Sequence, residues 1–169
     1  MLSRSSAAVE FAHCGRTDPL GIVESAVRRS SGYERVYCVI DRDSHANFDE
    51  AIAAAAGHAK VSVLASYPCF EYWLLLHFGY TRAPFQRAGN NSAADCVIQE
   101  LRRKVGMTEY SKGGTKDLFR LLLDRLPEAR TRAEQSLRDA EADGEKNPST
   151  PLHRLIDTLE ELGGPLPIL

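Results

Sequence analysis

The sequence contains no long apolar run. None of its hydrophobic stretches approaches the roughly 20 residues that a membrane-spanning helix requires. Its first ten residues, MLSRSSAAVE, also lack the apolar stretch that is typical of a secretory signal peptide. We therefore expect a soluble, cytoplasmic protein that makes no contact with a membrane.

Neither sign of charge is in strong excess. The chain has 21 lysine and arginine residues against 23 aspartate and glutamate residues, a formal net charge of -2, and its pI is about 6.2. This balance excludes a generally basic nucleic-acid-binding protein, because such proteins carry a broad positive surface. Any contact with nucleic acid must therefore be local, and we expect a metal ion to assist it.

Cysteine is scarce and has no C-x-x-C spacing. The four cysteines are widely separated, at Cys14, Cys38, Cys69 and Cys96. Zinc sites need clustered ligands, and three of these cysteines lie in or beside apolar segments. Buried free thiols are therefore a better interpretation than a zinc site.

Strand and helix patterns alternate in the first part of the chain. Runs of strand-forming residues, the first of them weak, are found at 6–12, 35–40 and 60–65. One helix is expected to begin after Asp18-Pro19, a capping residue followed by proline, and to end near Gly32, while another covers about 48–57. Strands that alternate with helices indicate a parallel sheet with right-handed crossovers, and therefore an α/β fold.

Helical patterns replace strand patterns from residue 66 onward. Apolar residues recur at helical spacing in two series, Leu118, Leu121, Leu122 and Leu126, and then Leu152, Leu155, Ile156, Leu159 and Leu162. Between the two series, opposite charges four positions apart over residues 128–138 predict a helix with a solvated face. We predict an α/β core at residues 1–80 and a helical part, packed on that core, at residues 81–169.

The segment VYCVIDRDSHANFDEAI, residues 36–52, places two aspartates directly after a buried strand. Asp41 and Asp43 would lie at the carboxyl edge of the sheet, where ligands of open α/β sheets bind. Two carboxylates one residue apart can share a hard cation such as Mg²⁺. The alternative is structural, because aspartate is a common turn former and the spacing of Asn47 and Glu50 is close to that of a capping box.

The segment SYPCFEYWLLLHF, residues 66–78, has hardly any polar face and predicts a deeply buried helix. Glu71 is its only acidic residue, and it follows the third predicted strand, at the same sheet edge as the two aspartates. A carboxylate in such apolar surroundings is costly unless it is paired or bound to a metal. The structural alternative is that Glu71 complements the helix dipole. His77 is interpreted as a hydrogen-bonded core histidine.

Together these two segments resemble the RloB-like family, a Toprim-type group linked to bacterial restriction and abortive-infection loci. The resemblance rests on the strand that ends in D-R-D, on a short strand followed by S-x-P-C-F-E-x-W-L-L-L-H-F, and on two later elements. These later elements are Y-x-K at Tyr110-Ser111-Lys112 and N-P-x-T at Asn147-Pro148-Ser149-Thr150. The resemblance implies a Toprim-like parallel sheet with flanking helices, followed by a helical C-terminal part.

The resemblance also implies a function, that of a nuclease or phosphodiesterase that depends on Mg²⁺ or Mn²⁺ and takes part in phage defence. Asp41, Asp43 and Glu71 would hold the metal, and Lys112 would complete the catalytic set. Lys112 is a plausible phosphate contact because it stands on a glycine-flanked loop, although a solvated lysine is an equal alternative. The implied partners are DNA or RNA and a protein of the defence system.

One element of Toprim-type sites is missing from the sequence. Such sites usually carry a glutamate at the end of an opening strand, in an E-G-x-x-x-E-like segment, which this sequence lacks. Glu10 is a poor replacement, since it is not at a strand end followed by glycine and a general base must first be in the right place. A catalytically impaired family member that binds nucleic acid or protein and regulates a partner is therefore the second hypothesis. A missing opening strand would also leave a sheet edge through which two copies could form a homodimer.

A third class consists of other D-x-D enzymes, which hold a metal on a diphosphate. A nucleotide-sugar enzyme would need more sheet before its D-x-D than about 40 residues provide, and an aspartyl phosphatase would need further downstream residues that are absent here. This class therefore ranks below the first two.

Overall fold

Two parallel strands form the sheet of this protein, for which the computed structural model describes residues 8–114 and 117–163. Strand β1 (Val36–Asp41) pairs with β2 (Val61–Ser66), so that Val36 lies opposite Val61 and Asp41 lies opposite Ser66. Helix α2 (Phe48–Ala56) connects them. Because the strands run in the same direction, both carboxyl ends reach the same edge of the sheet. The predicted α/β fold is confirmed.

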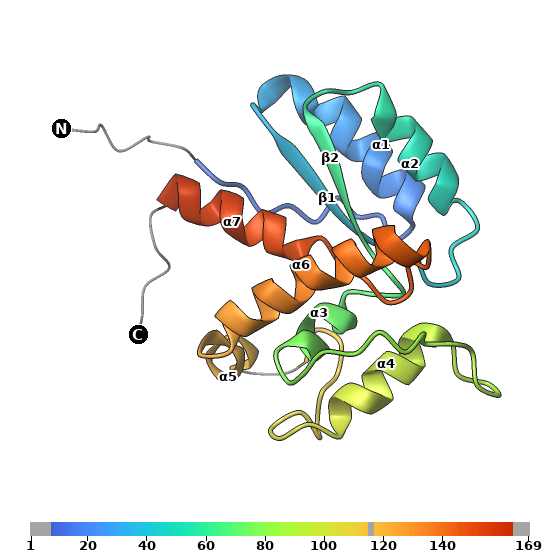
Figure 1. Ribbon diagram of the computed structural model, residues 1–169. Helices are drawn as coiled ribbons and strands as arrows, with labels where there is room; N and C mark the ends of the chain where they lie inside the picture. Colours follow the sequence, from blue (N-terminus) through green and yellow to red (C-terminus); the bar gives the residue numbers. More distant parts are fainter. Residues whose placement is uncertain (1–7, 115–116, 164–169) are drawn as a thin grey trace.

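Helices α1 (Pro19–Arg29) and α2 pack together along the two strands (Figure 1). Helix α1 begins where the sequence predicts, since the Asp18 side chain accepts a hydrogen bond of 2.8 Å from the Gly21 N–H and Pro19 is the first helical residue. It continues into a short 3-10 helix, η1 (Ser30–Gly32). The buried apolar side chains of this part are Val23, Cys38, Ile40, Phe48, Ala51, Ala55 and Val61.

A second cluster of buried side chains belongs to the helices that follow β2. These are α3 (Glu71–Leu76), α4 (Ala93–Arg102), α5 (Leu118–Leu123), α6 (Leu126–Asp143) and α7 (Leu152–Gly163). Every residue of α3 is buried, as predicted, and α3 packs against both α4 and α6. The two clusters meet where Tyr67, packed on the first, leads into Cys69, a member of the second. The predicted division at residue 80 stays a prediction.

The weak strand predicted at 6–12 is wrong for residues 8–12, while residues 6 and 7 lie outside the described ranges. Val9 and Phe11 are 48% and 80% exposed, so this segment has no apolar face against which a strand could pack. Glu10 lies 2.6 Å from the Arg29 guanidinium and accepts a hydrogen bond from the Tyr33 hydroxyl. The Glu10 carboxylate is therefore paired with side chains at and just beyond the end of α1.

Helix α6 has the predicted solvated face, on which Glu128, Glu134 and Arg138 are exposed, but it also has a buried face that the charge pattern did not indicate. Its alanines and one serine, Ala129, Ala133, Ser136 and Ala140, are buried. Of the opposite charges four positions apart in this helix, Arg138 and Glu134 form an ion pair at 2.6 Å. Arg130 instead pairs with two carboxylates of α7, and Arg132 donates to the Leu76 carbonyl at 2.6 Å. The first leucine series is divided between α5 and α6.

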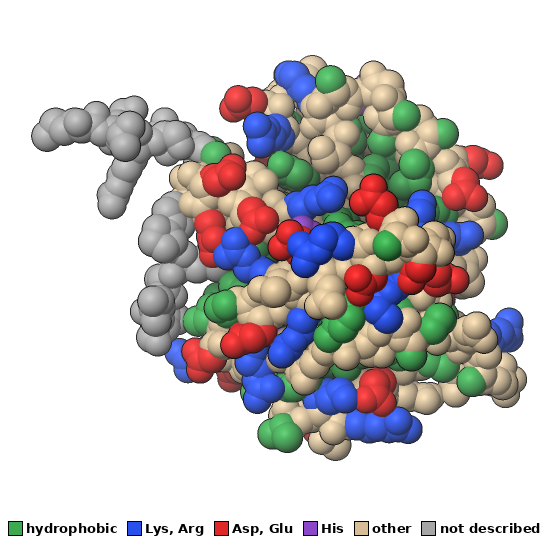
Figure 2. Space-filling view, in the orientation of Figure 1, with side chains coloured by type: hydrophobic (Ala, Val, Ile, Leu, Met, Phe, Trp, Pro, Cys, Tyr) green, Lys and Arg blue, Asp and Glu red, His purple; other side chains and the backbone are tan. Residues whose placement is uncertain are grey.

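Acidic and basic side chains are interspersed over α6 and α7 on the face shown in Figure 2. This mixture agrees with the near balance of charges in the sequence. None of the helices in the described ranges combines the length and the apolar character that crossing a bilayer requires.

Candidate functional site

A pocket of about 400 Å³ lies beside the last residue of β1. Its lining residues are Asp41, Phe70, Glu71, Tyr110, Ser111, Lys112, Gly113 and Leu118. Asp41 ends β1, Glu71 begins α3, and Lys112 lies on the loop between α4 and α5. Three of the four residues predicted for the site therefore meet in one pocket, although they are far apart in the sequence.

The Asp41 carboxylate is held by the backbone just before α3. Its Oδ1 accepts a hydrogen bond of 2.8 Å from the Phe70 N–H. Burial raises the pKa of Asp41 above its ordinary value; the Phe70 N–H opposes this rise, and the neighbouring Glu71 carboxylate adds to it. The fold thus holds a carboxylate in a place where its charged form is disfavoured.

The Glu71 side chain is the most deeply buried group of the pocket, with 3% of its surface exposed. Its Oε1 accepts a hydrogen bond of 3.1 Å from the Tyr110 hydroxyl and lies 3.5 Å from the Lys112 ammonium. Its Oε2 is buried and accepts no hydrogen bond from the described residues. A buried carboxylate oxygen without a partner is costly, so it marks a position for a donor or a cation.

Lys112 and Tyr110 reach the same oxygen of Glu71 from one loop. Burial lowers the pKa of Lys112, but neighbouring groups, Glu71 foremost, raise it by more, so the net shift is upward. The Lys112 side chain is 59% exposed, which leaves its ammonium accessible to a ligand. Burial, and then the Glu71 charge, raise the pKa of Tyr110, so its hydroxyl stays a donor. Tyr110 belongs to the Y-x-K element of the sequence, but sequence reasoning gave it no role in the site.

Asp43 is the predicted site residue that does not line the pocket. It is partly buried, and its N–H donates a hydrogen bond of 2.8 Å to the Pro68 carbonyl. Nor does it cap α2, which begins after Asn47, and the Asn47 side chain donates to Asp18 at 2.8 Å. In the described parts of the chain, no group of three or more histidine, cysteine, aspartate or glutamate side chains is arranged to hold a metal. A site with three carboxylates therefore stays a prediction.

The other candidate metal ligands of the sequence are structural. The four cysteines are free, and Cys38 and Cys69 are buried. His77 is 4% exposed, and its Nδ1 pairs with the Trp73 carbonyl at 3.0 Å. The prediction of a hydrogen-bonded core histidine is confirmed, and the prediction of buried free thiols is confirmed for Cys38 and Cys69, whereas Cys14 and Cys96 are free but only partly buried.

Two carboxylates in one pocket fit the requirements of Mg²⁺. This ion prefers oxygen ligands, keeps several waters, and is commonly held by one or two carboxylates together with a substrate phosphate. Asp41 and Glu71 supply such oxygens, and the Oε2 of Glu71 has no competing partner among the described residues. Asp41 and Glu71 are therefore the residues that would hold the ion.

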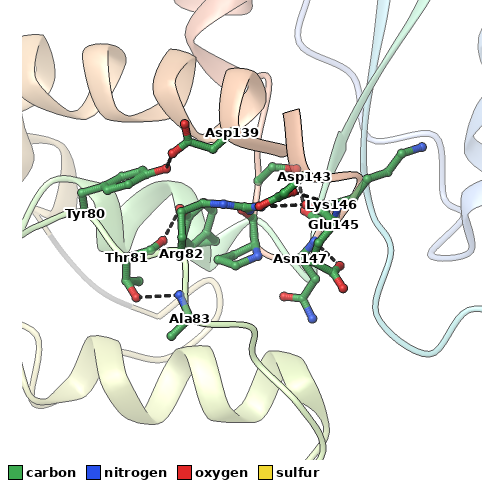
Figure 3. Close-up of polar contacts among 12 residues, drawn as sticks. Tyr80, Thr81, Arg82, Ala83, Asp139, Asp143, Glu145, Lys146 and Asn147 are labelled. Carbon is green, nitrogen blue, oxygen red and sulfur yellow. Dashed lines mark hydrogen bonds and ion pairs between the residues drawn. The ribbon is translucent and has the colours of Figure 1, made fainter. Parts of the chain in front are cut away.

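The N-P-x-T segment supports the site through its contacts with the end of β2. Ser149 and Tyr67 exchange two backbone hydrogen bonds of 2.8 and 3.0 Å, and the Thr150 hydroxyl lies 2.8 Å from that of Ser66. Arg82 holds the other end of the segment, because it donates to the Pro148 carbonyl at 2.6 Å and pairs with Asp143 (Figure 3). These contacts fix the end of β2, from which the chain continues to Glu71. No pattern in the sequence indicates this role of Arg82.

The raised pKa of Asp41 predicts how stability changes with pH. A carboxyl group whose pKa is higher in the folded state than in the unfolded state binds its proton more tightly when folded, so stability falls as the pH rises through that pKa. Asp41→Asn cannot ionise and keeps an oxygen for the Phe70 N–H. In the absence of divalent cations, we expect the variant to exceed the wild type in free energy of unfolding at pH 7, by an amount that shrinks as the pH falls through the raised pKa of Asp41 and is lost below about pH 4, near the ordinary pKa of aspartate. Urea unfolding between pH 3.5 and 7.5 measures this, and a difference that is independent of pH would contradict it.

Comparison with known proteins identifies the family of this chain. The profile of the RloB-like protein family matches residues 3–159, which is most of the chain. Neither a curated protein nor a solved structure gives a significant match. The matched range contains the whole pocket and the segments that support it. The chain therefore belongs to the RloB-like protein family.

Proposed function

We propose that this protein is a Toprim-type nuclease, dependent on Mg²⁺ or Mn²⁺, that cleaves phosphodiester bonds of DNA or RNA in phage defence. One observation carries the proposal: Asp41, the buried Glu71 and the accessible Lys112 converge on a single pocket in which a carboxylate oxygen has no described partner. Paired carboxylates beside a lysine suit a phosphate ester, because the carboxylates can hold a cation and the lysine can contact the anion.

Each side chain of the pocket has a distinct part in this proposal. The backbone N–H of Phe70 fixes Asp41, and the hydroxyl of Tyr110 fixes Glu71, so both carboxylates are positioned before a substrate arrives. Lys112 offers an ammonium that can bind a non-bridging phosphate oxygen. The metal, when bound, would supply an activated water and offset the charge that develops on the phosphate.

A catalytically impaired, regulatory protein is the second candidate, and one observation favours it. Asp41 and Glu71 are the carboxylates that line the pocket among the described residues, while Glu10 is attached to Arg29 at the end of α1. The pocket therefore offers no third carboxylate as a separate general base. Such a protein would bind nucleic acid or a protein partner without cleaving it.

Cleavage of labelled single-stranded and duplex DNA and RNA, with Mg²⁺, with Mn²⁺ and with a chelator, tests the proposal. We expect cleavage that requires the metal and is lost, by at least about 100-fold, in Asp41→Asn, because a metal ligand is removed. Asp49→Asn, an exposed residue in the first turn of α2, is the matched control and should cleave like the wild type.

The outcomes separate the two candidates. Cleavage that the Asp41 variant retains would overturn the proposed site. Binding of nucleic acid without cleavage, under every metal condition, would overturn the nuclease and favour the regulatory protein.

A further inference from the structure

Phe70 is exposed within a segment that is otherwise buried. It is 37% exposed, whereas Cys69 before it and all of α3 after it are buried. No aromatic pair or cation-π contact with the described residues includes Phe70, and neither cluster of buried side chains contains it. The side chain is therefore free to contact a ligand.

The position of Phe70 is fixed relative to the carboxylates. Its N–H donates to Asp41 Oδ1 at 2.8 Å, and the next residue in the chain is Glu71. Phe70 lines the same pocket, together with the partly buried Leu118. One part of the pocket is thus apolar, and the other carries two carboxylates and the ammonium of Lys112.

A nucleotide has the matching chemistry, since it combines a flat apolar base with an anionic phosphate. The pocket volume of about 400 Å³ lies within the range of small-molecule pockets, roughly 300–1,000 Å³. The buried Oε2 of Glu71, which accepts no hydrogen bond from the described residues, is a second sign that a ligand group completes this pocket. Within a duplex both faces of a base are covered by its neighbours, so only an unpaired base can stack on an exposed aromatic ring.

We propose that Phe70 is a stacking platform for an unpaired nucleobase, and that the site therefore takes single-stranded nucleic acid in preference to duplex. This inference rests on the proposed function and specifies its substrate class. Base stacking tolerates all four bases, so the platform selects for strandedness and not for sequence. Stacking involves the base and not the sugar, so DNA and RNA single strands both present the required group.

Fluorescence anisotropy with the full chain, in a chelating buffer that prevents cleavage, tests the inference. The probes are labelled 15-nucleotide single strands of DNA and of RNA and the duplexes of the same sequence. We expect the wild type to bind a single strand at least about 10-fold more tightly than the duplex, and Phe70→Leu to weaken single-strand binding by about 5- to 100-fold. Phe70→Leu keeps an apolar side chain but removes the aromatic face, and Phe70→Trp should bind like the wild type. Phe119→Leu, which replaces another exposed phenylalanine that does not line the pocket, is the matched control.

A second readout reports the stacking itself. In Phe70→Trp the fluorescence of the new tryptophan should be quenched by single strands, because Trp73 is 6% exposed and gives a constant background. Phe70→Leu that binds single strands as tightly as the wild type, or a wild type that prefers duplex, would overturn the inference. Single-strand binding that depends on Phe70 supports the stacking role, even if no metal restores cleavage. Cleavage that depends on Asp41 but not on Phe70 overturns the stacking role and leaves the proposed nuclease function in place.

Discussion

Replacing Glu71 with glutamine is expected to lower metal-dependent cleavage by at least about 100-fold while the protein stays folded. The expected loss is large because even groups that only orient a metal ligand contribute about 10- to 100-fold to metal affinity or activity. Glutamine removes the negative charge from the position where Oε2 has no described partner. It also removes the ionic partner of Lys112, which lies 3.5 Å from Oε1.

The free energy of unfolding should not fall when the cleavage activity falls, because burying the negative charge of Glu71 is itself costly. Glutamine keeps the shape of the side chain and keeps an oxygen that can accept the hydrogen bond of the Tyr110 hydroxyl. Lys112 is 59% exposed, so its ammonium can return to water when the ion pair is lost. We therefore expect the free energy of unfolding of Glu71→Gln to equal or exceed that of the wild type, as at other sites where function needs a destabilised group.

Cleavage rates and urea unfolding, measured side by side, check both halves of this prediction. Glu109→Gln is the matched control, because Glu109 precedes Tyr110 but is exposed and does not line the pocket. The control should retain the cleavage rate of the wild type. A Glu71→Gln protein that cleaves as fast as the wild type would limit Glu71 to a structural role.

Two short segments were sufficient to predict that Asp41 and Glu71 lie in one pocket. Parallel strands end at one edge of a sheet, so the sequence could place Asp41 and Glu71 together. It could not place Asp43, whose position depends on the turn that follows β1. Nor could it predict the part of Tyr110, because the loop between α4 and α5 reaches the pocket through tertiary packing. The pattern of strands and helices indicates which ends of elements meet, but not how a connecting loop folds over them.

The fold was predictable where apolar residues are large and was missed where they are small. The regular spacing of the charged residues of α6 predicted its solvated face but not the buried face opposite it. Its buried positions are Ala129, Ala133, Ser136 and Ala140, which recur at three- and four-residue intervals along one face. Small side chains contribute little to a hydrophobic pattern but allow helices to approach closely, and α6 packs against both α3 and α7. Counting alanine as part of the apolar face would have revealed this contact.

Ala133→Leu is therefore expected to lower the free energy of unfolding by about 2–3 kcal/mol, near the upper end of the usual cost of overpacking a core. Ala133 is 0% exposed and belongs to the buried cluster that contains all the apolar residues of α3. One position before it, Arg132 donates to the carbonyl of Leu76 at 2.6 Å, which holds α6 close to the end of α3. Three additional carbons have no space at such a contact, so the helices must move apart or side chains must leave their preferred rotamers.

Ala142→Leu provides the matched control for this overpacking. It makes the same substitution on the same helix, but Ala142 is exposed. Alanine and leucine have similar helix propensities, so the control should change stability by less than about 0.5 kcal/mol. Urea unfolding of the two variants and the wild type measures the difference. Equal stability of the two variants would mean that α6 is not packed tightly on α3. A loss confined to Ala133→Leu would establish that the alanine face of α6 holds α3, and with it Glu71, in place.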